Sequence, residues 1–185
     1  MRVVSGQWRG RKLLSPKGDL VRPTTDRVKE AMFSILGPSV RGCLVLDLCC
    51  GAGGLAIEAL SRGASKAILV DVHRKSLDLA RRNLELCGAG ADNFELVKSD
   101  AEVFFSGWEP PDDRTSWMLF CDPPYHTSVA VGIFHRLTHG DPAAGFKAGI
   151  IEHSADTVIE DSEKGPWKIN NRRYGETCLT VVRPG

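Results

Sequence analysis

The sequence has 185 residues, of which 42% are hydrophobic and 25% are charged, and its formal net charge at pH 7 is +1. This length and composition predict one compact domain with a sizeable core and argue against a multidomain assembly. No apolar run approaches the roughly 18 residues that a membrane span needs, and the first residues lack the apolar segment of a secretory signal. We therefore expect no membrane partner and a cytoplasmic location.

Cysteine and histidine spacing gives no sign of a metal centre. The six cysteines include no C-x-x-C pair, so neither a zinc ribbon nor a disulfide framework is predicted, and we expect reduced thiols. His135 and His139 are four residues apart on a predicted helix and could share a metal, but no third ligand is evident. The sequence thus predicts two solvated histidines and no metal site.

Positive charge is concentrated at the N-terminal end of the sequence. Residues 1–41 contain nine Lys and Arg against three Asp and Glu, whereas residues 42–185 contain fifteen against twenty. A basic arm on a weakly acidic body suits a polyanionic partner, although a solvated charged face has the same composition. Arg9, Arg11 and Lys12, which lie beside Trp8, are the residues that we expect to contact the phosphates of such a partner.

The same N-terminal part has its own predicted structure. Residues 2–14 have short apolar ends around Gly6 and Gly10, which is typical of a β-hairpin. A helix is predicted next, because apolar residues at 28, 31, 32, 35 and 36 share one helical face, and Thr24 or Thr25 is the expected cap. We predict an extension over residues 1–40 that contacts RNA and closes the site, followed by the main domain over residues 41–185.

Strand-like and helical patterns alternate from residue 43 onward. This rhythm predicts an α/β fold with a doubly wound, mostly parallel, Rossmann-like sheet, and two further strands without a helix between them predict an antiparallel hairpin at the end. The expected strands are 44–48, 67–72, 94–97, 118–121, 149–152, 168–174 and 178–182, and the expected helices are 54–62, 74–87, 101–106 and 128–138.

A ligand site is predicted at the end of the first strand of this sheet. Asp47 is followed by Gly51 and Gly53, and glycines there let the backbone approach a ligand closely. Asp71 and Asp100 stand at the ends of the next two strands, where they can take a ribose hydroxyl and an adenine amino group. An acid ahead of the glycines suits the ammonium group of S-adenosylmethionine and would repel a pyrophosphate. Each aspartate alone could instead cap a helix. The loop also fits the dinucleotide-binding pattern, so a nicotinamide cofactor is an alternative.

The tetrapeptide Asp122-Pro123-Pro124-Tyr125 follows the fourth strand and is the most specific motif in the sequence. Two prolines fix the backbone and remove two N–H groups, which leaves the Asp122 carboxylate and the Pro123 carbonyl as outward acceptors. Two acceptors suit an exocyclic amine as nucleophile, and Tyr125 could stack on the base that carries it. These features predict catalysis at Asp122–Tyr125. The alternative is that the four residues form a turn with a structural role only.

With these motifs in place, the sequence resembles the RsmD family, bacterial methyltransferases of a guanine N2 in small-subunit (16S) ribosomal RNA. Six segments carry the resemblance: Arg2 to Leu13, Arg22 to Phe33, Val45 to Leu55, Glu58 to Ala64, Asp122 to Tyr125 and Arg173 to Thr177. The resemblance implies a monomeric enzyme that binds S-adenosylmethionine through the loop, with Cys49, Val72 and Ala101 among the contacts and Arg22 and Thr24 closing over it. Cys49-Cys50 departs from the family, which usually has an aromatic and a small residue there.

Several functions remain open on the sequence alone. A methyltransferase of guanine in ribosomal RNA is the favoured hypothesis, with either RNA alone or a particle carrying ribosomal proteins as substrate. Adenine N6 in DNA or a glutamine amide in a protein are alternative targets, because both motifs also occur in those enzymes. A nicotinamide-dependent oxidoreductase or a catalytically silent binding module would use the same loop.

Overall fold

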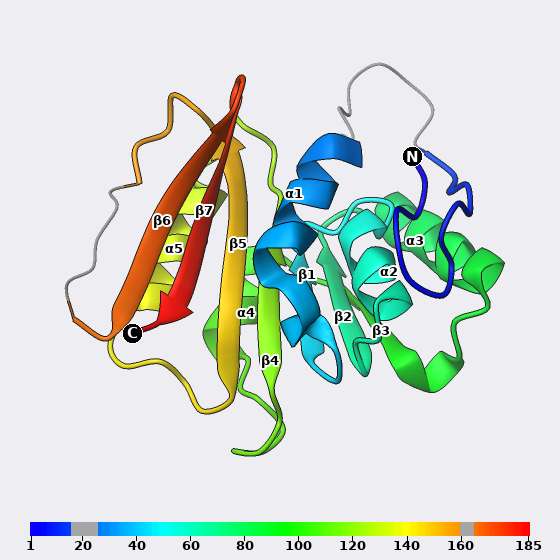
Figure 1. Ribbon diagram of the computed structural model, residues 1–185, viewed down its shortest axis with the longest axis horizontal. Helices are drawn as coiled ribbons and strands as arrows, with labels where there is room; N and C mark the ends of the chain where they lie inside the picture. Colours follow the sequence, from blue (N-terminus) through cyan, green and yellow to red (C-terminus); the bar gives the residue numbers. More distant parts are fainter. Residues whose placement is uncertain (16–25, 160–164) are drawn as a thin grey trace.

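Seven strands among the described residues form one sheet in the order β3-β2-β1-β4-β5-β7-β6, in which β1 to β5 are parallel and β7 is antiparallel to both neighbours. The computed structural model describes residues 1–15, 26–159 and 165–185 (Figure 1). The strands are β1 (Leu44–Leu48), β2 (Lys66–Asp71), β3 (Phe94–Lys98), β4 (Trp117–Cys121), β5 (Phe146–Ser154), β6 (Trp167–Tyr174) and β7 (Thr177–Pro184).

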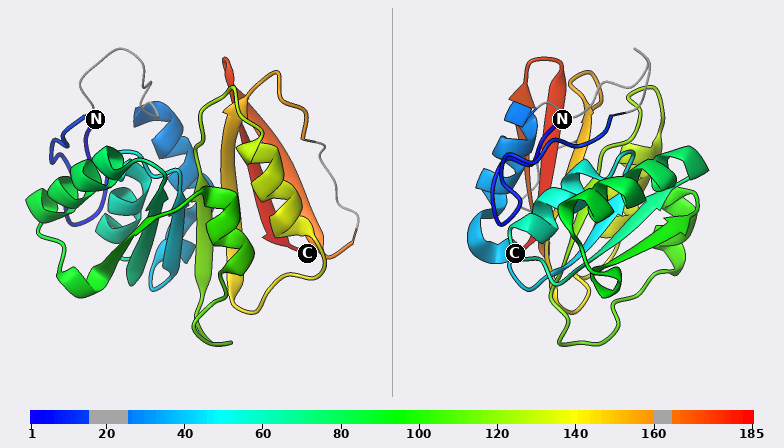
Figure 2. Two further views of the ribbon diagram at one scale, coloured as in Figure 1. Left: turned by 180° about the vertical axis from the view of Figure 1, so that it is seen from behind. Right: turned by 90° about the vertical axis from the view of Figure 1, so that its right-hand side faces the viewer.

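Helices cover both faces of the sheet, as the alternating pattern predicts (Figure 2). One hydrophobic core lies beneath α1, α2 and α3, and a second lies beneath α4 and α5. The helices are α1 (Asp26–Leu36), α2 (Gly54–Ser61), α3 (Arg74–Cys87), α4 (Ala101–Gly107) and α5 (Val129–Thr138), with 3-10 turns η1 (Gly37–Val40) and η2 (Ala91–Asn93). The described helices include none that is long and apolar enough to span a membrane.

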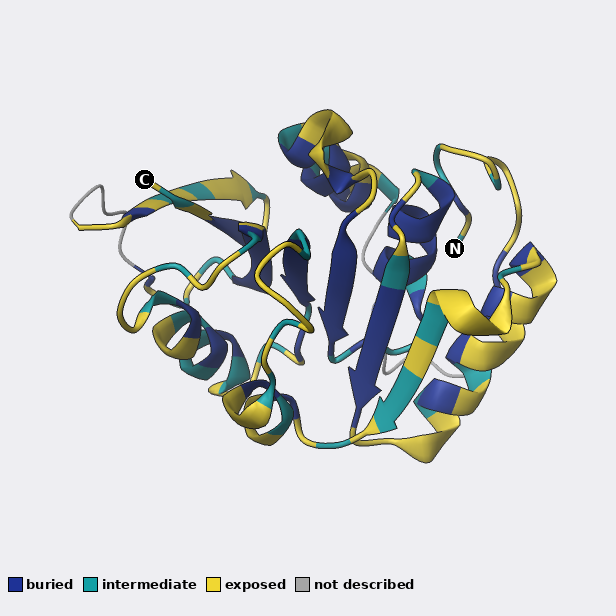
Figure 3. Cartoon of the chain, turned by 90° about the horizontal axis from the view of Figure 1, so that it is seen from below, coloured by how far each residue is buried: buried dark blue, intermediate teal, exposed yellow. Residues whose placement is uncertain are grey.

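The central strands β1 and β4 are buried along their whole length, as parallel strands covered on both faces require (Figure 3). The predicted elements are confirmed within a few residues. The largest difference is β5, which runs from Phe146 to Ser154 because its antiparallel pairing with β7 continues to its last residue.

The predicted N-terminal β-hairpin is present as a short, irregular antiparallel pairing. Residues 1–15 contain no regular strand, but Arg2 and Lys12 form an antiparallel bridge, and the Val3 and Leu13 N–H groups donate across it to the carbonyls of Arg11 and Met1. In the turn between the two arms, backbone N–H groups bond to α2 instead: Val4 and Ser5 donate to Glu58, and Gln7 donates to the Ser61 carbonyl oxygen. Because these donors are taken by a helix, the pairing does not extend into a longer ladder.

A buried charge pair holds this N-terminal segment and α1 to α2. The Lys29 ammonium is 1% exposed and lies 3.8 Å from the Glu58 carboxylate, which is fully buried. Glu58 also accepts from Arg62 at 2.8 Å. Burial lowers the pKa of Lys29, and the charges of Glu58 and Asp26 oppose that shift. Residues 1–15 and α1 therefore belong to the same packed body as the sheet, while the predicted boundary at residue 41 stays a prediction.

Candidate active site

Four aspartates line up along the carboxyl edge of the parallel strands. Asp47 is the fourth residue of β1, Asp71 ends β2, Asp100 follows β3 by two residues, and Asp122 directly follows β4. Because the strand order is β3-β2-β1-β4, the sheet sets these residues in the spatial order 100, 71, 47, 122. The carboxyl edge of an open α/β sheet is where such folds bind ligands.

Asp47 is the most buried of these acids. It is 1% exposed, and its Oδ2 accepts a hydrogen bond from the Ala56 backbone N–H of α2 at 2.9 Å. Burial raises the pKa of Asp47 to about 7, and the negative charges of Asp122 and Asp71 add to this shift, while the Ala56 N–H opposes it. The carboxyl group is therefore partly protonated near neutral pH, and a nearby cation would favour its charged form.

The glycine loop leaves room for a ligand. Gly51 has a φ of 53°, and a Cβ placed on it would meet no atom within 4 Å, so the space beside its backbone is open. Gly53 has a φ of 79°, and a Cβ there would lie 3.2 Å from the Cβ of Ala80, so this glycine allows α3 to pack closely. The two predicted loop glycines thus have different tasks, and Gly51 is the one that faces open space.

Asp71 braces the loop from the next strand. Its Oδ2 accepts from the Gly51 N–H at 3.0 Å, and its Oδ1 accepts from the His73 N–H at 2.8 Å. A carboxylate can accept further bonds on both oxygens, so these contacts leave capacity for a ribose hydroxyl. Val72 beside it is 48% exposed, which is unusual for a valine that follows a buried strand and suits contact with a planar ring.

Asp100 acts as the N-cap of α4. Its Oδ1 accepts from the backbone N–H groups of Glu102 and Val103 at 2.9 and 3.0 Å. The alternative noted from the sequence, a helix cap, is therefore real for this residue, and the capped helix begins with the buried Ala101. Both bonds use Oδ1, so the cap does not engage Oδ2.

Cys49, where the sequence departs from its family, has an unusual backbone. Its φ of 64° is the one left-handed value among the described residues other than glycine. Such a conformation costs about 1–3 kcal/mol and persists where the surrounding structure imposes it. Its side chain packs toward β4: a hydrogen bond with the Cys49 thiol, together with burial, raises the pKa of Cys121. The cofactor loop and the strand that carries the tetrapeptide are thus in direct contact.

The tetrapeptide forms a turn at the end of β4, beside the glycine loop on β1. The Asp122 N–H donates to the Leu48 carbonyl oxygen at 3.4 Å, and Pro123 is buried while Pro124 is exposed. Thr127 bonds to the Pro124 carbonyl through its hydroxyl at 2.8 Å. No described residue donates a hydrogen bond to the Pro123 carbonyl, and its use as an outward acceptor stays a prediction.

The Tyr125 hydroxyl is held by two side chains that the sequence analysis missed. It donates to Glu152 Oε1 at 2.9 Å and lies 2.6 Å from Thr177 Oγ1. Because its one proton goes to Glu152, the Thr177 hydroxyl is the donor in the second bond. Glu152 is 4% and Thr177 6% exposed. An acid at the end of the apolar strand β5 was the available signal for Glu152, whereas Thr177 gave none.

These contacts also fix the protonation state of the tyrosine. Burial raises the pKa of Tyr125 to about 12, and the Glu152 charge adds to the shift. The phenol therefore stays neutral at physiological pH. The hydroxyl is anchored to β5 and β7, so the position of the ring is held at both of its ends.

The predicted RNA-contact residues lie on the N-terminal segment, which packs on α2 and α3. Gly6, at the tip of the segment, packs against Ser61 at the C-terminal end of α2, and Arg11 donates to the Leu86 carbonyl near the end of α3. The other end of the segment reaches the glycine loop, because Leu14 bonds to Asn83, which also donates to the Ala52 carbonyl. Arg9, Arg11 and Lys12 are exposed, so their contact with RNA stays a prediction. Arg22 and Thr24 lie outside the described residues.

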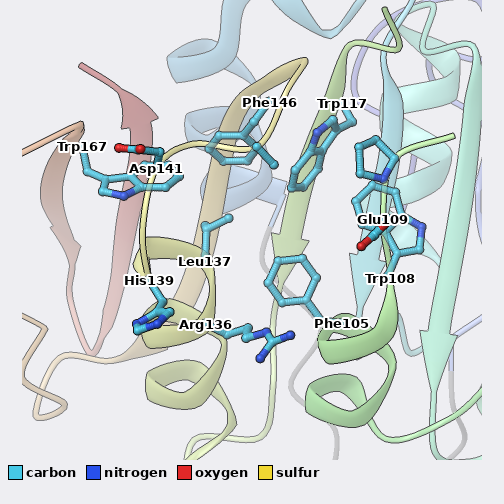
Figure 4. Close-up of a pocket in the computed structure, with 12 residues that line it drawn as sticks. Phe105, Trp108, Glu109, Trp117, Arg136, Leu137, His139, Asp141, Phe146 and Trp167 are labelled. Atoms are coloured by element: carbon cyan, nitrogen blue, oxygen red, sulfur yellow. The ribbon is translucent and has the colours of Figure 1, made fainter. Parts of the chain in front are cut away.

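A cavity of about 180 Å³ lies at the edge of the sheet opposite the four aspartates (Figure 4). Trp117, Phe146 and Trp167, which begin β4, β5 and β6, form its walls. Their rings pack against one another, with centroids 4.6 Å apart for the first two and 5.7 Å for the last two. This hollow contains none of the aspartates of the carboxyl edge, and its aromatic walls belong to the second core.

The strand order, the glycine loop after β1 and the Asp-Pro-Pro-Tyr turn after β4 define a Rossmann-like class I methyltransferase fold. The family model described as Conserved hypothetical protein 95 matches residues 1–183. The chain therefore belongs to this family, the RsmD family of methyltransferases.

Named relatives support this membership. Ribosomal RNA small subunit methyltransferase D of Escherichia coli is 39% identical over 129 residues, which cover 70% of this chain and 62% of that protein, less than two thirds of its length. YlbH of Bacillus subtilis is 39% identical over 183 residues, which cover 99% of this chain and 98% of YlbH. The solved structure of yhhF from E. coli has a TM-score of 0.81 at 30% identity and covers 100% of this chain and 97% of its own.

Proposed function

We propose that this chain transfers a methyl group from S-adenosylmethionine to the exocyclic N2 amine of a guanine in small-subunit ribosomal RNA. The observation that carries the proposal is that the two motifs are neighbours. The glycine loop follows β1 and the Asp122–Tyr125 turn follows β4, and these two strands pair in parallel up to Leu48 and Cys121. The name of the E. coli relative supports ribosomal RNA as the substrate. We further propose a cytoplasmic monomer that meets this RNA alone or within a small-subunit particle.

The residues of the carboxyl edge fit S-adenosylmethionine, which supplies an electrophilic methyl group on a sulfonium. Asp47 would face the ammonium group of the cofactor, Asp71 its ribose hydroxyls, and Asp100 its adenine amino group. Asp47 is already close enough to Asp71 and Asp122 for their charges to raise its pKa, so this edge would repel the pyrophosphate of a nicotinamide cofactor. The remaining proposed contacts are Cys49, Gly51, Gly53, Val72 and Ala101.

The Asp122–Tyr125 turn would prepare the amine for attack. The lone pair of an exocyclic amine is delocalised into the ring, so acceptors on both N–H groups favour its rehybridisation. The Asp122 carboxylate and the Pro123 carbonyl are those acceptors. As the N–C bond forms and the bond between methyl and sulfur breaks, the amine loses a proton that Asp122 accepts or passes to water.

Tyr125 would serve as the platform for the base. Stacking on an aromatic ring contributes roughly 1–3 kcal/mol per base, which offsets part of the few kcal/mol needed to unstack it from the RNA. A platform must stay in place, and the hydroxyl, which donates to Glu152 and accepts from Thr177, is held in position by both bonds. The neutral phenol also keeps negative charge away from the ring face.

A labelling experiment tests the proposal. The protein is incubated with methyl-labelled S-adenosylmethionine and, separately, with deproteinised 16S ribosomal RNA, small-subunit particles, DNA and a protein extract, and the products are digested to nucleosides or amino acids. We expect label in N2-methylguanosine from RNA. Label only in N6-methyladenine of DNA or in glutamine would overturn the proposed substrate. If the protein bound NAD and did not bind S-adenosylhomocysteine, the proposed activity would be overturned.

A further inference from the structure

On one face of the β6–β7 hairpin, α1 reaches β7, while most of the outer strand β6 stays exposed. In Figure 1, α1 crosses the front of the sheet near β1 and β4, while α5 lies behind the hairpin. Figure 2 shows the same arrangement from behind. The side chains of β6 that alternate toward the front are Lys168, Asn170, Arg172 and Tyr174, and they are called the β6 stripe below.

The direction of the β6 stripe follows from its partners on β7. Lys168 pairs with Arg183, whose guanidinium donates to the Ile35 carbonyl of α1 at 2.6 Å, so both point to the α1 side of the sheet. Tyr174 packs against the core beneath α1. Lys168 and Arg172 are exposed, and Arg172 donates to Asn170 on the same face at 3.3 Å.

The charge of this hairpin is unbalanced. Residues 165–185 contain four Lys and Arg and one Asp or Glu, whereas residues 42–164 contain eleven against nineteen. Among the described residues, neither Lys168 nor Arg172 forms an ion pair. Lys168 and Arg183 are directly opposed cations, an arrangement that destabilises an isolated sheet and that a bound polyanion would relieve.

The β6 stripe also leads to the candidate active site. Its upper end, Tyr174, pairs with Thr177, and the Thr177 hydroxyl bonds to Tyr125. Four alternate positions along a strand span about 20 Å, enough to follow an RNA strand away from a base held at Tyr125. By contrast, the predicted RNA-contact residues Arg9, Arg11 and Lys12 lie on the N-terminal segment, which packs on α2 and α3 at the other end of the strand order (Figure 1).

We propose that the β6 stripe, with Arg183, binds the phosphate backbone of the RNA whose base enters the Asp122–Tyr125 site. This inference rests on the proposed function. It moves the RNA-binding surface from the N-terminal segment to the sheet face beside the catalytic turn. Lys168 and Arg172 supply positive charge, Asn170 supplies hydrogen bonds, and Tyr174 supplies an aromatic surface between the charges and the site.

Salt-dependent binding of deproteinised 16S ribosomal RNA tests this inference. The double variant Lys168→Gln/Arg172→Gln should weaken binding and flatten the slope of log affinity against log salt by about 1.4–1.8, at roughly 0.7–0.9 per lost phosphate contact. The matched control is Arg81→Gln/Arg82→Gln, which removes two exposed cations from α3 at the far side of the sheet. The control should retain the wild-type slope, and both variants should bind S-adenosylhomocysteine as the wild type does.

A third variant separates the two candidate surfaces. If the variant Arg9→Gln/Arg11→Gln/Lys12→Gln has a flatter salt dependence of RNA affinity while the β6 variant keeps the wild-type dependence, the inference is overturned in favour of the N-terminal segment. An equal loss in the α3 control overturns it in favour of unspecific charge. Should the double variant fold poorly, Arg172→Gln alone should flatten the slope of log affinity against log salt by about half as much. Methyl transfer to RNA by the wild type is measured in parallel: its absence would refute the proposed function, whereas transfer with an unchanged β6 slope would refute only this inference.

Discussion

The hydroxyl of Tyr125 lies 2.6 Å from the Oγ1 of Thr177, and this contact joins the Asp122–Tyr125 turn after β4 to the first residue of β7. Tyr125→Phe should keep the stacking ring but release its anchor, so we expect a rise in KM for RNA and a loss of about 1–3 kcal/mol of stability from the unsatisfied buried partners. Since the pKa of Tyr125 is about 12, the shape of the pH–rate profile below pH 10 should not change. A lost alkaline limb in the variant would show that the phenol titrates during the reaction.

Asp122→Asn should abolish most methyl transfer and leave the affinity for S-adenosylhomocysteine within a few-fold. The reason is that this carboxylate would face the reacting amine, whereas the loop after β1 would hold the cofactor. We expect kcat to fall by roughly 10²–10³, the usual effect of removing one preorganised polar group. Calorimetry measures the affinity. Asp78→Asn, on the exposed surface of α3, is the control and should retain full activity. A collapse of cofactor binding in a folded Asp122→Asn protein would refute this division of tasks.

The affinity for S-adenosylhomocysteine should depend on the ionisation of Asp47. Its pKa is raised to about 7, and a bound ammonium favours the charged carboxylate, so affinity should rise as pH increases from 5.5 through 7 and then level off. The limiting slope is about tenfold per pH unit. Calorimetry in buffers of different ionisation enthalpy should detect proton release at pH 6. In Asp47→Asn the affinity should be lower and independent of pH over this range; a retained slope would exclude Asp47 as its source.

The stability of the empty protein should depend on the same group with the opposite sign. The pKa of Asp47 in the folded protein lies above the ordinary value of 3.8, so its protonated form favours the folded state. Its contribution is present below about pH 4 and is lost as the pH rises through 7. Denaturant unfolding should therefore show Asp47→Asn to be more stable than the wild type at pH 8, with the difference shrinking toward pH 4. No difference at pH 8 would contradict the raised pKa.

The pair Lys29 and Glu58 should be the most sensitive charged site for stability. Glu58→Gln removes the buried carboxylate partner of Lys29, leaves only the part-exposed Asp26 at 3.9 Å, and weakens the bonds to Val4 and Ser5, so we expect a loss of about 3–5 kcal/mol. The exposed pair of Lys66 and Glu95, at 3.4 Å, is the control, and Glu95→Gln should change stability by less than about 1 kcal/mol. Equal effects in urea unfolding would show that burial does not determine the contribution of these pairs.

The sequence by itself determined the class of fold and the main parts of the candidate site. Apolar runs and helical periodicity predict the strands and helices because burial on both faces of a parallel sheet imposes those patterns locally. Asp47, Asp71, Asp100 and Asp122 are recognisable because each stands near the end of a strand, and the parallel order brings strand ends together. The Asp-Pro-Pro-Tyr turn is likewise local, since its prolines fix it without long-range contacts.

Tertiary structure decided what depends on residues far apart in the sequence. Thr177 meets Tyr125 across 52 positions and Glu58 meets Val4 across 54, so no local pattern could indicate either contact. The predicted hairpin over residues 2–14 is short and irregular for the same reason, because α2 offers acceptors that the isolated segment lacks. Which basic residues lie beside the Asp122–Tyr125 turn depends on the antiparallel return of β7, which sets Arg172 on that side of the sheet, whereas Arg11 bonds to α3.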